Sequence, residues 1–254
     1  GVALIQFGDP PMNFISQPLM EGIEGAVARA KAAGCRVVVL ASTTPGYFIA
    51  HGALSGIIAG ARAGVRADPY AVHQSAFFRL MRELELGPMV SIAGNNGQAW
   101  GGGAEFGWAC NLRIAAESAT YGQPEVPLGI SPGAGGTVRL ARIIGVARCL
   151  EMVLGGRPIS AAKALEWGAV NRVVDHAELE NTAIEWARTI NGKSPTAQRM
   201  LKFAFNLTDD GLMGQQVFAG EATRLAYMTD EAVEGRDAFL EKRSPDWDTF
   251  PYYY

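Results

Sequence analysis

The chain has 254 residues, of which 48 % are hydrophobic and 19 % charged, and its formal net charge is −3. This is the composition of an ordinary globular protein, long enough for one large domain or two small ones with a sizeable core. Because no basic run or stripe is present, nucleic acid is not expected as a partner. No apolar run reaches the roughly 18 residues that a membrane helix needs, so no membrane association is expected.

The three cysteines, Cys35, Cys110 and Cys149, are widely separated and match no metal or redox spacing. Each stands among apolar or small residues, which favours buried free thiols in a reducing compartment. The sequence therefore predicts a cytoplasmic protein without a metal site.

The first half of the chain alternates strand-like and helix-like segments. Val2–Phe7 and Arg36–Ala41 have apolar strand patterns, and between them Ser16 can cap a helix that runs to about Ala33. The expected elements that follow are a helix over 70–86, a strand over 89–93, a helix over 102–109 and a strand over 112–115. Strands that alternate with helices predict an α/β architecture joined by crossovers.

The second half of the chain is predominantly helical from Gly135 onward, and Val170–Val174 is the one strand-like segment there. Helices are expected over 137–144, 146–154, 160–167, 177–190, 195–206, 212–228 and 230–242. The run Gly192–Pro195 is interpreted as a joint. Residues 1–191 are therefore expected to form the core that carries the site, and residues 192–254 a C-terminal helical region.

Three consecutive glycines, Gly101 to Gly103, stand between an expected strand and an expected helix. Such glycines let the backbone approach a ligand closely, and a helix N-terminus leaves N–H groups unpaired. These groups suit a phosphate or an oxyanion, although neither common phosphate-loop spacing is present. A tight strand–helix junction without chemistry explains the glycines alone equally well.

Two glutamates accompany this glycine cluster. Glu105 lies in the first turn of the expected helix, either as a partner of the helix dipole or as a carboxylate over a ligand bound there. Glu125 follows between Pro124 and Pro127, which keep it off any helix. Two carboxylates near one oxyanion site can add water across an activated double bond or move a proton between carbons.

Three motifs together resemble the crotonase (enoyl-CoA hydratase/isomerase) superfamily. They are Gly94–Glu105 (GNNGQAWGGGAE), Tyr121–Glu125 (YGQPE) and Pro132–Leu140 (PGAGGTVRL), and the similarity continues through 154–160, 169–173 and 234–243. The resemblance implies a spiral of ββα units with a C-terminal helical trimerisation region. It also implies a homotrimer, or a hexamer of two trimers, and an acyl-CoA thioester as the substrate without a further cofactor.

The resemblance assigns roles to residues at matching motif positions. It implies an oxyanion hole formed by the backbone N–H groups of Gly52 and Gly102. Glu125 is then the proton donor to the α-carbon, and Glu105 is the base that activates water. Both roles benefit from apolar surroundings that raise the carboxyl pKa. Further substrate or water contacts are expected at Ala50, His51, Gly101, Gly133, Trp108 and Lys242.

The first oxyanion loop departs from the family pattern. His51 stands where a glycine is usual, Ala53 where an acid is usual, and Ser55 where a CoA-contacting lysine is frequent. His51 is interpreted as a structural residue, because the amide and not the side chain forms the hole; a substrate contact is the alternative.

Two further groups of residues are candidates for contacts with the substrate. Arg62, Arg66 and Lys242 are candidates for contacts to the CoA phosphates. Trp100 and Trp108 either line an acyl pocket or fill the core.

Three functions are compatible with these observations. The first is hydration of a 2-enoyl-CoA, or the reverse dehydration, on the two glutamates. The second is another reaction of the same scaffold, namely isomerisation, decarboxylation, or CoA-independent hydrolytic cleavage of a β-diketone, which the unusual His51 favours. The third is a non-catalytic or RNA-binding relative, which the near-neutral charge and the intact glutamates disfavour.

Overall fold

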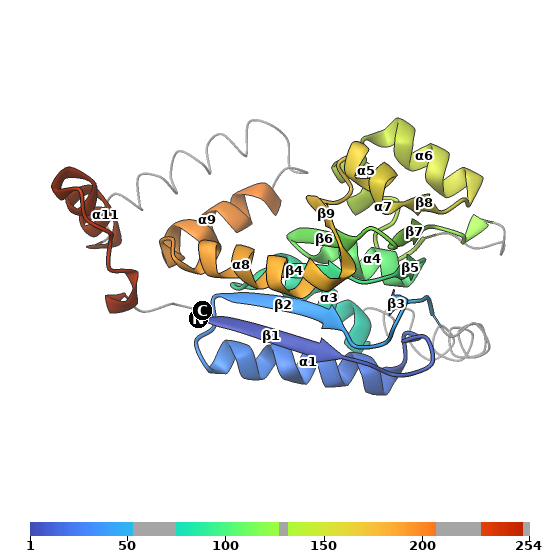
Figure 1. Ribbon diagram of the computed structural model, residues 1–254, viewed down its shortest axis with the longest axis horizontal. Helices are drawn as coiled ribbons and strands as arrows, with labels where there is room; N and C mark the ends of the chain where they lie inside the picture. Colours follow the sequence, from blue (N-terminus) through green and yellow to red (C-terminus); the bar gives the residue numbers. More distant parts are fainter. Residues whose placement is uncertain (53–74, 127–131, 207–229, 251–254) are drawn as a thin grey trace.

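The computed structural model describes residues 1–52, 75–126, 132–206 and 230–250, which form two sheets with helices packed on them (Figure 1). The five-stranded parallel sheet has the order β1 (Val2–Phe7), β2 (Val37–Ser42), β4 (Val90–Asn95), β6 (Leu112–Ala116) and β9 (Arg172–Val174). The four-stranded sheet has the order β3 (Tyr47–Ile49), β5 (Gln98–Trp100), β7 (Thr120–Gly122) and β8 (Ile159–Ser160). Its last pair, β7 and β8, is antiparallel.

The chain passes repeatedly from the first sheet to the second and then into a helix. β2 and β3 precede α3 (Ala76–Leu86), β4 and β5 precede α4 (Gly102–Ala109), and β6 and β7 precede α5 (Arg139–Ile144). In each unit the first strand pairs in parallel with the first strand of the unit before it. The predicted spiral of ββα units is therefore confirmed.

Strand β2 is buried on both faces, as its continuous apolar sequence predicts for a parallel strand covered by helices. Val37 and Val39 pack against α8 (Leu179–Asn191). Val38 and Leu40 face the main core, to which α1 (Gln17–Ala32) contributes. In Figure 1, α1 and α8 lie on opposite sides of this sheet. Full burial of each such side chain contributes about 1.5–3 kcal/mol.

Several expected elements have the predicted bounds. Ser16 caps α1, because its hydroxyl accepts a hydrogen bond from the Leu19 amide at 3.3 Å. α4 and α9 (Pro195–Asn206) begin and end at the predicted residues. Of the helix expected over 70–86, the structure describes α3; residues 70–74 and the helix expected over 212–228 lie outside the described residues.

The second sheet is the main feature that the sequence patterns did not predict. Its strands are two or three residues long, too short to show the period of two that identifies a strand. β8 also corrects the expectation of a single strand after Gly135. The remaining described elements are α6 (Val146–Gly155), α7 (Ala161–Glu166), α11 (Asp230–Glu241) and the 3₁₀ turns His176–Glu178 and Trp247–Thr249.

Helix α9 is attached to the core by a buried lysine. Lys202 Nζ donates to the Leu84 carbonyl at 2.8 Å and to the Met89 carbonyl at 2.5 Å, between the end of α3 and the start of β4. α11 lies at one end of the molecule (Figure 1). The boundary between residues 191 and 192 stays a prediction.

Two further expectations from the sequence concern the burial of the cysteines and the membrane. Cys110 and Cys149 are buried free thiols as predicted, whereas Cys35 is a free thiol that is half-buried. Among the helices that the structure describes, none combines the length and apolar character needed to cross a membrane.

Candidate active site

The candidate site lies where β5 leads into α4. Gly101 joins them with a backbone φ of +52°, a conformation that residues other than glycine rarely adopt. A Cβ atom on Gly103 would lie 1.9 Å from the Ile49 carbonyl oxygen. Because neither residue has a side chain, the N-terminus of α4 packs directly on the backbone of β3. As the first residue of α4, Gly102 has no acceptor for its N–H within the helix.

The segment that contains the other predicted oxyanion donor runs beside this helix start. The Trp100 amide donates to the Ala50 carbonyl at 3.0 Å, at the end of β3. Ile15 forms a β-bridge with Gly52, and its Cδ1 would lie 2.5 Å from a Cβ atom on Gly102. Gly52 and Gly102 therefore both lie next to Ile15.

Glu105 projects from the first turn of α4 and is 3 % exposed. Its Oε1 accepts hydrogen bonds from the amides of Ala134 and Gly136, both at 2.8 Å. Its Oε2 would lie 3.9 Å from a Cβ atom on Gly102. Burial raises the pKa of Glu105, while the amides of this turn and the charge of Arg139 oppose the rise.

Glu125 follows β7, is 8 % exposed, and lies beside the neighbouring glycine, Gly101. Its Oε1 would lie 2.9 Å from a Cβ atom on Gly101. Burial is the main cause that raises the pKa of Glu125 to about 7; its own backbone amide opposes the rise, and the nearby charge of Glu105 adds to it. The two carboxylates that the sequence singled out therefore share one site.

A buried glutamine links Glu125 to the core. With its amide nitrogen toward Glu125, Gln123 donates to Oε1 and Oε2 at 3.2 and 3.1 Å and accepts from Trp108 Nε1 at 3.2 Å. Trp108 is buried and stacks on Tyr121, with 5.2 Å between ring centroids. Trp108 thus fills the core behind Glu125, and its direct contact with an acyl group stays a prediction. Sequence reasoning passed over Gln123, although it lies inside the YGQPE motif.

The histidine of the first oxyanion loop is engaged with its own surroundings. His51 Nδ1 lies 2.7 Å from the Gly52 carbonyl oxygen, which requires Nδ1 to carry the proton. The ring also packs edge-on against Phe14, with 5.0 Å between centroids. These contacts agree with the interpretation of His51 as a structural residue.

Of the other residues predicted to contact substrate or water, some lie near Glu105 and others do not. Ala50 is buried at the end of β3, and Gly133 is exposed and directly precedes the Ala134 amide that binds Glu105. Lys242 is exposed and directly follows α11, far from α4 (Figure 1), so the described part of one chain does not bring it to the site. Arg62 and Arg66 lie outside the described residues.

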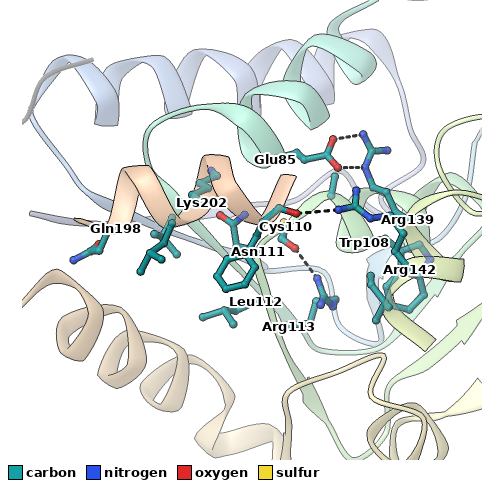
Figure 2. Close-up of a pocket in the computed structure, with 15 residues that line it drawn as sticks. Glu85, Trp108, Cys110, Asn111, Leu112, Arg113, Arg139, Arg142, Gln198 and Lys202 are labelled. Carbon is teal, nitrogen blue, oxygen red and sulfur yellow. Dashed lines mark hydrogen bonds and ion pairs between the residues drawn. The ribbon is translucent and has the colours of Figure 1, made fainter. Parts of the chain in front are cut away.

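A cavity of about 590 Å³ opens at the other end of α4, between β6, α5 and α9 (Figure 2). Neither Glu105 nor Glu125 lines it, so it is distinct from the candidate site. Arg139 borders this cavity and pairs with Glu85. Arg139 lies within the PGAGGTVRL motif, and the sequence pattern alone indicated no role for it. Within the described ranges, no cluster of three or more His, Cys, Asp or Glu side chains could hold a metal ion.

Comparison with known proteins shows the family to which the chain belongs. The family model for enoyl-CoA hydratase/isomerase matches residues 1–249. The crystal structure of an enoyl-CoA hydratase from Bacillus anthracis superposes with a TM-score of 0.85 at 35 % sequence identity, covering 98 % of this chain and 95 % of that one. An enoyl-CoA hydratase from Mycobacterium smegmatis superposes with a TM-score of 0.84 at 26 % identity, covering 96 % and 94 %.

Curated relatives with a different name are more similar in sequence. A 1,4-dihydroxy-2-naphthoyl-CoA synthase from Mycobacterium tuberculosis is 50 % identical over 210 residues, which are 82 % of this chain and 64 % of that protein. The synthase of the same name from Mycolicibacterium smegmatis is 52 % identical over 188 residues, 74 % of this chain and 61 % of that protein. The matched region thus spans less than two thirds of these relatives. The chain belongs to the enoyl-CoA hydratase/isomerase family, within the crotonase superfamily.

Proposed function

We propose that the protein is an enzyme that adds water to the 2,3 double bond of an acyl-CoA thioester, or removes it. The observation that carries this proposal is that Glu125 and Glu105 lie against two successive glycines, Gly101 and Gly102, close enough for their charges to interact. A thioester carbonyl bound by the amides of Gly52 and Gly102 would present its α- and β-carbons to these carboxylates. Two preorganised N–H donors stabilise the enolate oxygen, and each contributes roughly 3 kcal/mol in comparable oxyanion holes.

In the proposed hydration, water attacks the β-carbon and loses a proton to Glu105. The π electrons move onto the thioester oxygen, so an enolate forms in the oxyanion hole. The enolate then collapses, and its α-carbon takes a proton from Glu125. The hydroxyl group and both hydrogens of the product are thereby accounted for, and the proton left on Glu105 returns to Glu125 through solvent.

The different surroundings of the two carboxyl groups support this division of roles. The amides of Ala134 and Gly136 favour the ionised form of Glu105, as a base requires. Glu125 has a pKa of about 7 and therefore carries a proton in a large fraction of molecules at neutral pH. Since Oε1 of Glu105 already accepts two bonds, Oε2 is the oxygen left to receive a proton from water. Carboxyl groups whose environments separate their pKa values are the usual arrangement for an acid and a base.

The test is turnover of 2-enoyl-CoA thioesters with acyl chains of four to sixteen carbons. Turnover is measured as the loss of the absorbance of the conjugated enoyl group. A product heavier by one water, identified by mass spectrometry, would support the proposal. Folded protein that leaves every chain length unchanged, in both directions of the reaction, would overturn it. The same reactions in H₂¹⁸O would place the label on the β-carbon.

Synthesis of a naphthoyl-CoA thioester is the second candidate, because the relatives with about 50 % identity carry that name. Forming a second ring next to a thioester also requires an enolate at the α-carbon, so the same oxyanion hole would serve. Assay of the open-chain aryl thioester that closes to 1,4-dihydroxy-2-naphthoyl-CoA separates the two candidates. A bicyclic product with no hydration of enoyl-CoAs would favour the synthase.

Assembly into trimers or pairs of trimers belongs to this proposal as well. Apolar side chains on α9 are exposed in the single chain, namely Leu201, Phe203 and Phe205. A contact between Lys242 and the substrate would require a second copy of the chain, because α11 lies away from α4 (Figure 1). Light scattering gives the mass of the assembly directly, and a monomer at micromolar concentration would contradict this part.

A further inference from the structure

The hydrogen bonds that hold Glu105 come from a turn that is itself held from behind. Glu105 Oε1 is bound by the amides of the peptide groups 133–134 and 135–136. The peptide group between them, 134–135, presents its carbonyl oxygen the other way. Arg139 Nη1 donates to this Ala134 carbonyl at 2.7 Å. The same turn is therefore bound by Glu105 through its amides and by Arg139 through the Ala134 carbonyl.

Arg139 also fills the space beside this turn. A Cβ atom on Gly135 would lie 2.4 Å from Arg139 Nη1, and Gly135 has φ +123°. The Gly135 carbonyl accepts the Arg139 amide at 2.7 Å, which starts α5. The guanidinium therefore lies directly against the turn whose amides bind Glu105.

A carboxylate on a different helix fixes the guanidinium. Glu85, in the last turn of α3, accepts from Arg139 Nε at 2.8 Å and from Nη2 at 2.5 Å, and Figure 2 shows this two-fold contact. The two side chains are 19 % and 20 % exposed, so the pair is largely shielded from water. A bidentate arginine–carboxylate pair fixes orientation as well as charge.

We propose that Arg139, held by Glu85, is a positioning residue that orients the turn Gly133–Gly136 and through it the carboxylate of Glu105. The proposal rests on the proposed function in one respect, namely that Glu105 acts as a base. Arg139 itself does not touch the reacting atoms in this arrangement. Its contribution is geometric, through the Ala134 carbonyl, and electrostatic, through a positive charge that favours ionised Glu105.

The charged and titratable groups around Glu105 can be named. Helix α4 packs against α3, α5, β3 and β5. These elements supply Arg79, Arg82, Glu83 and Glu85 from α3, Arg139 and Arg142 from α5, and Tyr47 from β3, while Glu125 lies across the site. Among them, Arg139 is the cation whose charge acts on Glu105 and lowers its pKa.

The chain offers a matched control for this ion pair. Arg79 and Glu24 join α3 to α1 with the same two-fold geometry, Nε at 2.8 Å and Nη2 at 2.7 Å. Their contact is more exposed, at 46 % and 32 % of the two side chains, and involves no residue of the site. Arg79→Gln thus removes a similar pair without touching Glu105.

The first experiment compares Arg139→Gln, Arg139→Lys and Arg79→Gln in the hydratase assay. Arg139→Gln is expected to lower kcat about tenfold or more, with KM changed less than twofold. In the plot of kcat against pH, it should also move the acidic limb to higher pH by about one unit, because loss of a neighbouring positive charge raises the pKa of a carboxyl group. Arg139→Lys keeps the charge and loses the two-fold contact, so it should lower kcat several-fold with a smaller shift. Arg79→Gln should match the wild type.

The second experiment needs no substrate, so it separates failure of this inference from failure of the proposed function. The carboxyl resonance of Glu105 in protein labelled with [¹³C]glutamate is identified by its loss in Glu105→Gln and then titrated. A rise in its pKa in Arg139→Gln, absent in Arg79→Gln, supports the inference even where no acyl-CoA is turned over. If Arg139→Gln does not fold, Arg139→Lys carries the test. Wild-type pKa and kcat in the folded Arg139 variants would overturn the inference.

Discussion

The surroundings of Glu105 and Glu125 differ although both are buried carboxylates that lie beside successive glycines at the start of α4. Glu105 accepts two backbone amides from the 133–136 turn and feels the positive charge of Arg139. Glu125 accepts from a neutral side chain, Gln123, and is stabilised by its own backbone amide, but it lies next to another negative charge. Burial raises the pKa of both, but donors and cations oppose the rise more strongly at Glu105. Two identical residues are thus held in different electrostatic surroundings, as the proposed roles of base and acid require.

The largest expected effect comes from removing either carboxylate. Glu105→Gln and Glu125→Gln should each lower kcat by about 10²–10⁴-fold, since each removes one proton transfer. KM should change little, because neither residue forms the oxyanion hole. Steady-state kinetics with a 2-enoyl-CoA measures both constants, and a thermal unfolding scan verifies the fold. Near-wild-type rates in either variant would show that the two-carboxylate mechanism is wrong.

A second substitution tests the close backbone contact between α4 and β3. Gly103→Ala places a Cβ atom 1.9 Å from the Ile49 carbonyl, which should destabilise the fold by about 3 kcal/mol or more. Gly107, on the same helix, has no atom within 4 Å of its Cβ position, so Gly107→Ala should be neutral or stabilise by about 0.5–1 kcal/mol. Denaturant unfolding compares the two. Equal stability of the variants would contradict the close approach of α4 to β3.

The pH dependence of stability sharpens the contrast at Glu125. Its pKa in the folded state is about 7, above the ordinary value of 4.5, so folding stability is greatest below about pH 4.5 and falls as the pH rises to about 7. Glu125→Gln removes this loss and should therefore be more stable than wild type by about 2–3 kcal/mol at pH 8, with less difference at pH 5.

Unfolding free energies at the two pH values measure this effect, with Glu117→Gln at an exposed position as the control. A pH-independent difference would show that Glu125 is ionised in the folded protein throughout this range. In the kinetics, the same pKa predicts that kcat declines above about pH 7 as the proton donor is lost.

A smaller effect is expected from the glutamine behind Glu125. Gln123→Leu removes two donors to the carboxylate, so the pKa of Glu125 should rise and the alkaline limb of kcat should move upward. It also leaves the buried Trp108 N–H without its acceptor, at a cost of about 1–3 kcal/mol. Adding Trp108→Phe removes that N–H, so the double variant should lose less stability than the sum of the single ones. Additive losses would show that Gln123 and Trp108 are not coupled.

The smallest effect is expected at His51. Its ring contacts Phe14 and the Gly52 carbonyl, so it supports the loop whose amide is the proposed donor. His51→Ala should therefore lower kcat less than about tenfold, the contribution of roughly one hydrogen bond. Activity that persists with strict dependence on CoA would also count against the β-diketone hydrolase. Complete loss of activity in a folded variant would instead indicate a direct substrate contact.

Much of the site could be predicted because its signals are local in the sequence. Glu105, Glu125 and the glycines of α4 stand in contiguous motifs, and the bounds of α4 follow from the glycine cluster and the apolar run after it. The strands β1, β2, β4 and β6 are long apolar segments and were predicted within a few residues. The short strands of the second sheet were not, because their pairing partners, and not their own composition, define them.

The sequence by itself determined the family, the alternation of strands and helices, and the two carboxylates. The tertiary structure decided how those carboxylates differ, because the deciding contacts join residues that are distant in the chain. Glu105 meets the Ala134 amide across 29 positions, and Arg139 meets Glu85 across 54. No pattern of composition or periodicity records such pairs. Spatial packing therefore gives two glutamates of similar appearance different surroundings: amides oppose the rise in pKa at Glu105, whereas the pKa of Glu125 rises to about 7.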